Sequence, residues 1–170
     1  MWIYSRWLQG TMKILVKKPK DCTDEELTKF RQLVQFGGQV EPNGLADRIL
    51  NCRFLGLCFI NDDLVGVSAI KQPSEIKTKR IKERAKIHNE TLPQFELGYS
   101  VTKVEFRGQK INSRLNDKLL EEMDKNGIIY ATTNNNAMRN FLISRGFKRL
   151  GESFEGSFNI ILDYYEKTLK

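Results

Sequence analysis

The stretch that decides the fold is FELGYSVTKVEFRGQKINSRLNDKLL, Phe95–Leu120. Apolar residues alternate over 95–104, which predicts a strand. A turn at Arg107-Gly108 follows, and apolar residues then recur at helical spacing over about 110–125. The first N–H groups of a helix have no partner within the helix, and the helix dipole makes them attractive to phosphate oxygens. The sequence therefore predicts that this turn holds a phosphorylated ligand.

The elements around this stretch predict one domain of mixed α+β class with helices on both faces of a sheet. Thr23 and Glu26 form a capping-box signature that begins a helix ending near Phe36, before two glycines. Strands are expected over residues 13–17, 52–60, 64–71, 95–104, 128–132, 147–150 and 157–165. Helices are expected over residues 23–36, 45–50, 74–90, 110–125 and 136–145.

Length and composition agree with a single domain. The 170 residues suffice to bury a core, and we expect residues 1–11 to be an N-terminal extension of a domain over 12–170. No stretch is long and apolar enough for a membrane span. Three cysteines, an odd number without metal or disulfide spacing, suit a reducing cytoplasm. The single histidine, His88, stands outside any Cys/His cluster, so no metal site is expected.

Two motifs in sequence order resemble those of the GCN5-related N-acetyltransferases, the GNAT family. The first is Arg107-Gly108-Gln109-Lys110-Ile111-Asn112, where the family pattern is Arg/Gln-x-x-Gly-x-Gly/Ala. The second is IIYATTNNNAMRNFLISRGFKRLGE, Ile128–Glu152, in which Asn135 precedes Gly146-Phe147 by eleven residues. The resemblance implies a single GNAT-like domain with a central mixed, mostly antiparallel sheet flanked by helices on both faces.

The resemblance also implies a ligand and a reaction. The ligand is acetyl-CoA, and the reaction is transfer of its acetyl group to a primary amine by direct attack, without a metal. The acceptor is a small molecule or a protein, and the protein is a monomer or a homodimer. The positions that match the family's CoA contacts are Val101, Thr102, Lys103, Arg107, Gly108, Gln109, Lys110, Ile111, Asn112, Ser113 and Asn135.

Acid–base chemistry is predicted at Glu96 and Tyr130. Glu96 lies on the strand that leads to the cofactor turn, where many GNAT enzymes place a carboxylate that deprotonates the amine. The family's usual proton donor is a Tyr four residues before Gly-Phe, but this position is Leu142 here. Another group therefore serves as the donor (Tyr130, Tyr164, Tyr165 or Ser144), or water protonates the thiolate.

Two alternatives stay open. Residues 71–86 hold seven basic and two acidic side chains, a net charge of +5, which suits a nucleic acid or tRNA partner as well as a solvated helix. This segment has no aromatic side chain on which bases could stack, so nucleic acid ranks second. The other alternative is a GNAT-like protein that binds CoA without efficient catalysis, because Leu142, Lys110 and Asn112 depart from the family pattern.

Overall fold

The structure is a computed structural model and describes residues 10–170. The predicted extension over residues 1–11 falls mostly on residues 1–9, which lie outside the described range.

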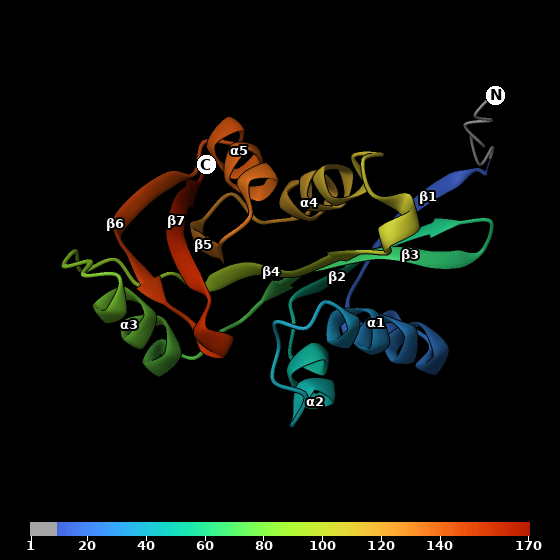
Figure 1. Cartoon of the computed structure of the whole chain (residues 1–170), viewed down its shortest axis with the longest axis horizontal. Helices are drawn as coiled ribbons and strands as arrows, with labels where there is room; N and C mark the ends of the chain where they lie inside the picture. The colour runs from blue at the N-terminus through green and yellow to red at the C-terminus, as the bar shows by residue number, and fades with distance from the viewer. Residues whose placement is uncertain (1–9) are drawn as a thin grey trace, which may run out of the picture.

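A seven-stranded sheet with the order β1-β2-β3-β4-β5-β7-β6 forms the centre of the molecule (Figure 1). β4 and β5 pair in parallel, and each other neighbouring pair is antiparallel. The sheet is therefore mixed and mostly antiparallel, as predicted. The strands are β1 (Met12–Lys17), β2 (Phe54–Ile60), β3 (Asp63–Lys71), β4 (Phe95–Thr102), β5 (Gly127–Thr133), β6 (Lys148–Glu155) and β7 (Ile161–Leu169).

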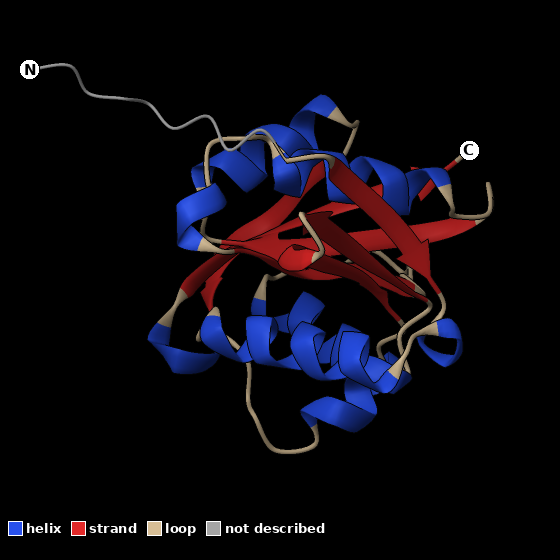
Figure 2. Cartoon of the chain, turned by 90° about the vertical axis from the view of Figure 1, so that its right-hand side faces the viewer, coloured by secondary structure: helices blue, strands red, loops and turns tan. Residues whose placement is uncertain are grey.

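Helices cover both faces of this sheet, so the predicted layers are confirmed (Figures 1 and 2). One face carries α1 (Asp24–Phe36), α2 (Leu45–Leu50) and α3 (Glu75–Arg84), and the other carries α4 (Ile111–Glu121) and α5 (Asn136–Ser144). Separate apolar cores fill the spaces beneath them: α1 and α2 pack on Leu57 and Val67, whereas α4 and α5 pack on Leu97 and Ile129. No helix within residues 10–170 has the length and apolar character needed to cross a membrane.

Local sequence signals explain most helix boundaries. The capping box of α1 is present: Thr23 Oγ1 accepts from the Glu26 N–H at 3.1 Å, and the Glu26 carboxylate accepts from the Thr23 N–H at 2.9 Å. Ser74 caps α3 and Asn135 caps α5 with one bond each, accepted by the side chain from a backbone N–H three residues later.

The C-terminal strands differ from the prediction. β6 continues to Glu155 rather than stopping at residue 150, and β7 runs from Ile161 to Leu169 rather than over 157–165. The sequence predicts a break in the strand near Gly151, but Gly151 adopts φ +67° inside β6, where the ladder with β7 is irregular. Residues 166–168 lie outside the predicted strand, but they belong to β7 and pair with Ile128, Ile129 and Tyr130 of β5.

The helix α3 is shorter than predicted, and its C-terminal end is fixed to the sheet. It ends at Arg84 instead of continuing to residue 90. The buried Lys82 ammonium donates to Asn89 and Thr91, which holds the segment that follows the helix. Beyond the helix, the Ala85 carbonyl accepts from the Glu152 N–H at 2.8 Å, and a Cβ at Gly151 would overlap that carbonyl oxygen.

Candidate functional site

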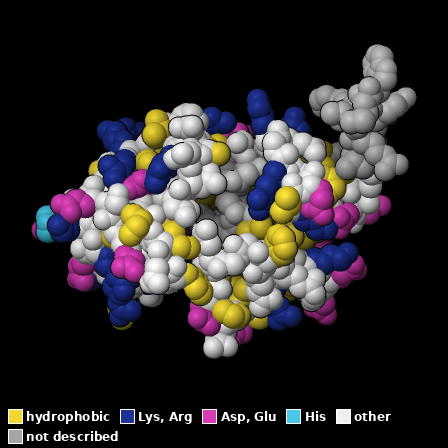
Figure 3. Space-filling model, in the orientation of Figure 1, with side chains coloured by type: hydrophobic (Ala, Val, Ile, Leu, Met, Phe, Trp, Pro, Cys, Tyr) yellow, Lys and Arg dark blue, Asp and Glu magenta, His cyan; other side chains and the backbone are white. Residues whose placement is uncertain are grey.

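The central strands β4 and β5 separate soon after they begin. They are paired only at Phe95 with Ile129 and at Glu96 with Tyr130, although β4 continues to Thr102 and β5 to Thr133. The separation exposes backbone groups along the later half of β4 on the side that faces β5. It lies below α4 and α5, and the surface is recessed there (Figures 1 and 3). This recess, the β4–β5 groove, is the candidate site.

A bulge in β4 lies next to the groove. Tyr99 has φ +56°, in the left-handed region that an aromatic residue rarely adopts, and the register between β3 and β4 shifts at Ser68. Val101 and Thr102 pair again with β3 after the bulge. The irregularity therefore precedes the predicted positions 101–104. Gly98 was its only sequence signal, because a glycine within a strand often marks a bulge.

The predicted phosphate turn follows β4 directly. Gly108 has φ +82° and Lys110 has φ +59°, so the chain turns through two left-handed residues before α4 begins at Ile111. Within the described residues, α4 differs from α1, α3 and α5 in that its N-cap side chain, Lys110, makes no capping hydrogen bond. The N–H groups of residues 111–113 are therefore available to an external acceptor.

The predicted cofactor residues around this turn differ in their exposure to solvent. Those before the helix, Arg107, Gly108, Gln109 and Lys110, are exposed, and Arg107 Nε donates to the Thr102 carbonyl at 3.4 Å. The side chains that follow turn inward.

Ile111 is buried against β3 near Gly66, and Asn112 Oδ1 accepts from Asn116 Nδ2 at 3.0 Å, while Ser113 is partly buried. Asn135 Oδ1 accepts from the Met138 N–H at 3.0 Å, which leaves its amide nitrogen and one lone pair of Oδ1 for a ligand.

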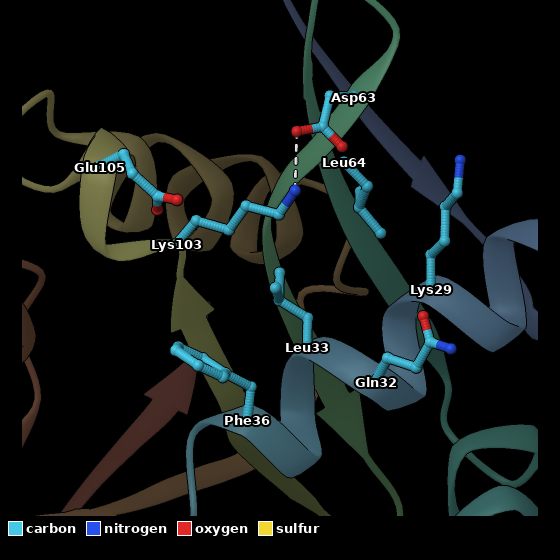
Figure 4. Close-up of a pocket in the computed structure, with 8 residues that line it drawn as sticks. All are labelled: Lys29, Gln32, Leu33, Phe36, Asp63, Leu64, Lys103 and Glu105. Atoms are coloured by element: carbon cyan, nitrogen blue, oxygen red, sulfur yellow. Dashed lines mark hydrogen bonds and ion pairs between the residues drawn. The ribbon is translucent and has the colours of Figure 1, made fainter.

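Lys103 is directed away from the groove. Its N–H donates to the Val65 carbonyl of β3 at 2.8 Å, and its Nζ lies 2.7 Å from Asp63 Oδ2. Figure 4 shows this ion pair at a pocket of about 410 Å³ that faces α1, with Leu33 and Phe36 on its wall. A cofactor contact through the N–H or the ammonium of Lys103 would therefore compete with bonds that already exist.

Glu96 is a buried carboxylate held by three donors. Lys71 Nζ lies 2.6 Å from its Oε1, Lys77 Nζ lies 2.8 Å from its Oε2, and the Tyr130 hydroxyl donates to Oε2 at 3.1 Å. Burial opposes ionisation of Glu96, but the charges of Lys71 and Lys77 outweigh it and lower its pKa to about 2. Because β3 and α3 supply the lysines, this cluster was not visible in the sequence.

Tyr130 lies on the opposite side of β5 from α4 and α5. Its neighbours Ile129 and Ala131 pack under those helices, whereas Tyr130 packs with Ala85 and stacks on Tyr164 at a ring distance of 5.3 Å. Burial raises the pKa of its hydroxyl, and the charge of Glu96 raises it further. The proton that Tyr130 carries is therefore held firmly and is directed to Glu96.

The other candidates for a proton donor are also engaged. Leu142, at the position of the family's Tyr, is fully buried in the core under α5. Tyr164 donates to Glu166 at 2.7 Å, and Ser144 donates to the Phe141 carbonyl at 2.7 Å. Tyr165 is buried in the same core as Leu142.

The basic segment 71–86 offers little free charge. Lys71 and Lys77 bind Glu96, and Lys82 is buried. Two further lysines form surface ion pairs, Lys79 with Glu75 at 3.7 Å and Lys86 with Glu152 at 2.7 Å.

Of the seven cations in this segment, Arg80, Lys82 and Arg84 lack an ion pair within residues 10–170, and of these three only Arg80 and Arg84 are exposed. Four of the seven predicted surface cations are therefore engaged in ion pairs within the fold.

Comparisons with known proteins find structural matches but no match in sequence. No protein-family model and no curated protein sequence matches the chain. Solved structures do match it over nearly the whole length.

An acyl-CoA N-acyltransferase from Pseudomonas aeruginosa aligns with a TM-score of 0.69 and 13% identity, covering 92% of this chain and 99% of the other. A GNAT-family acetyltransferase from Streptococcus agalactiae gives 0.66 and 16%, covering 92% and 96%. Naa50 from Arabidopsis thaliana, in complex with a bisubstrate analogue, CoA-Ac-MVNAL, gives 0.63 and 20%, covering 91% and 97%. At these identities the likeness is one of architecture, and the chain has the GNAT fold.

Proposed function

We propose that this protein is an acyl-CoA-dependent N-acyltransferase, and specifically that it transfers an acetyl group from acetyl-CoA to a primary amine. The observation that carries the proposal is the early separation of β4 and β5 beside a helix whose first N–H groups have no side-chain cap. An extended, polar chain fits along an unpaired strand edge, and a pyrophosphate fits the helix start. The Arabidopsis Naa50 structure with its CoA-containing analogue supports the same ligand.

In the proposed complex the pyrophosphate binds the N–H groups of residues 111–113, with Arg107 and Lys110 adding positive charge. The thioester lies in the β4–β5 groove near Tyr99, where a backbone N–H of β4 polarises its carbonyl. The neutral amine attacks the carbonyl carbon, the carbon–sulfur bond breaks, and CoA leaves as a thiolate that takes a proton from water. The amine loses its own proton as the amide forms.

Glu96 is the proposed acceptor of that proton, and the structure sets a condition on this role. A carboxylate with a pKa of about 2 is a poor base at neutral pH. Lys71 and Lys77 therefore have to move off its oxygens when the acceptor binds. In this proposal Tyr130 stays bonded to Glu96 and orients it.

One further candidate function shares the cofactor site. The full burial of Leu142 and the engagement of Glu96 favour a protein that binds CoA without efficient catalysis.

Calorimetry with acetyl-CoA, followed by a thiol-release assay against a panel of amines, distinguishes the two. Thiol release that depends on an amine supports the transferase, and CoA binding without release supports the binding protein. Absence of CoA binding contradicts both.

A further inference from the structure

A buried polar chain connects β3, β4 and α4 beside the groove. Ser68 Oγ lies 2.7 Å from Ser100 Oγ and 2.6 Å from Asn116 Oδ1, and Ser100 Oγ lies 3.4 Å from the same amide oxygen. Ser68 and Asn116 are fully buried, whereas Ser100 is partly exposed. The surrounding core is apolar, so each polar atom in this chain needs a partner.

The hydrogen bonds of the cluster determine where the hydroxyl proton of Ser100 points. Asn116 Nδ2 donates to Asn112 Oδ1 at 3.0 Å, which turns Asn116 Oδ1 toward the two serines. Ser68 donates to that oxygen or to the Gly98 carbonyl, at 2.6 and 3.2 Å. The Ser100 proton then goes to Ser68 or to Asn116. Both hydroxyl protons are used inside the cluster, which leaves the lone pairs of Ser100 as its outward-facing group.

The location of Ser100 identifies what those lone pairs meet. It lies in the part of β4 that has separated from β5, one residue after the bulge at Tyr99. Asn116 Nδ2 also lies 3.8 Å from Met138 Sδ of α5, so β4, α4 and α5 converge at this point. Ser100 therefore lines the β4–β5 groove on the side of α4 and α5.

We propose that Ser100 is a recognition residue that accepts a hydrogen bond from an uncharged secondary amide N–H of the ligand in this groove. The Ser68–Ser100–Asn116 cluster carries no charge, so it suits a neutral donor better than an ammonium group, whose burial would require a counter-charge. The pantetheine arm of CoA holds two secondary amides. The inference rests on the proposed function, since it places that arm in the groove.

The test compares ligands with and without the arm. Calorimetry measures the affinity of CoA and of adenosine 3′,5′-bisphosphate for the wild type, for Ser100→Ala and for Lys110→Ala. Ser100→Ala loses one neutral hydrogen bond, so we expect it to bind CoA about fivefold to tenfold more weakly than the wild type. Its affinity for the bisphosphate should be unchanged. Lys110→Ala, at the phosphate turn, is expected to weaken both ligands.

Ser100→Cys is the second variant, because a thiol is a weak acceptor of similar shape, and it should show the same selective loss. Unchanged CoA binding in both Ser100 variants, or equal losses for the two ligands, overturns the inference and leaves the proposed function intact. Failure of the wild type to bind CoA overturns the proposed function, and the inference with it.

Discussion

Glu96 is bound to Lys71 and to Lys77 at the same time: one carboxylate oxygen lies 2.6 Å from Lys71 Nζ and the other lies 2.8 Å from Lys77 Nζ. Lys71 comes from β3 and Lys77 from α3. This single side chain therefore joins the helix between β3 and β4 to the point where β4 and β5 begin to separate.

The free energy of unfolding should decrease at acid pH because Glu96 becomes protonated. Its pKa falls from 4.5 to about 2 in the folded state, because the two lysine charges outweigh the effect of burial. The stabilisation is fully present above about pH 4.5 and is lost as the pH falls toward about 2. Urea unfolding of wild type and Glu96→Gln at about pH 7, 5 and 3 should show a free-energy difference that shrinks at the lowest pH. A difference that stays constant with pH contradicts the assignment.

Removing one lysine tests whether Glu96 acts as the base. Lys77→Ala removes a positive charge, so the pKa of Glu96 should rise. If Glu96 accepts the amine proton, the acidic limb of the kcat/KM profile should move to higher pH. The matched control is Lys79→Ala on the same helix, whose exposed partner is Glu75. A profile that is identical in Lys77→Ala and wild type argues against Glu96 as the base.

The phosphate turn depends on the conformation of Gly108. Its φ is +82°, which proline cannot adopt, since its ring fixes φ near −65°. Gly108→Pro should weaken acetyl-CoA binding by roughly tenfold or more, measured by calorimetry. Thermal unfolding is measured alongside, because the exposed turn lies outside the core and the variant should still fold. Unchanged affinity would refute the placement of the pyrophosphate at this turn.

Nucleic acid binding, if present, should depend only weakly on salt. Two exposed cations of the basic segment, Arg80 and Arg84, lack an ion pair among the described residues, and each phosphate contact contributes about −0.9 to the slope of log K against log salt. Fluorescence anisotropy with a labelled duplex should give a slope near −2 or smaller in magnitude. A slope of about −5 or steeper would instead support the hypothesis that the protein binds nucleic acid.

Restoring the family's tyrosine should not restore a proton donor. Leu142 is fully buried in the core under α5, so Leu142→Tyr overpacks the core and buries a hydroxyl group. We expect the variant to lose about 1–3 kcal/mol in unfolding free energy, with no gain in thiol release. Leu142→Met, which conserves volume, is the control and should lose less. A faster Leu142→Tyr enzyme would show that this position reaches the groove.

The sequence predicted features that depend on neighbours along the chain. The capping box at Thr23 and Glu26, the short helix α2 and the turn at Gly108 are local signals, and each appears where expected. The mixed, mostly antiparallel sheet with helices on both faces followed from the family resemblance, which two motifs in the right order carried.

Features that depend on contacts between distant segments were missed. The lysines that bind Glu96 lie 25 and 19 residues before it, and no spacing rule connects them. The bulge at Tyr99 had only Gly98 as a signal. The role of the Ser100 hydroxyl could not be predicted from the sequence, because its partners Ser68 and Asn116 come from β3 and α4.

Gly151 determines whether the segment that contains α3 could be moved into another protein. Since its hydrogen atom is all that fits against the Ala85 carbonyl, the segment between β3 and β4 and the middle of β6 form a matched pair, although 66 residues separate them. If a protein with a side chain at the position of Gly151 received only the segment between β3 and β4, that side chain would overlap the carbonyl at the position of Ala85. In a chimeric protein the insert should dock only when residue 151, or its counterpart, is also glycine.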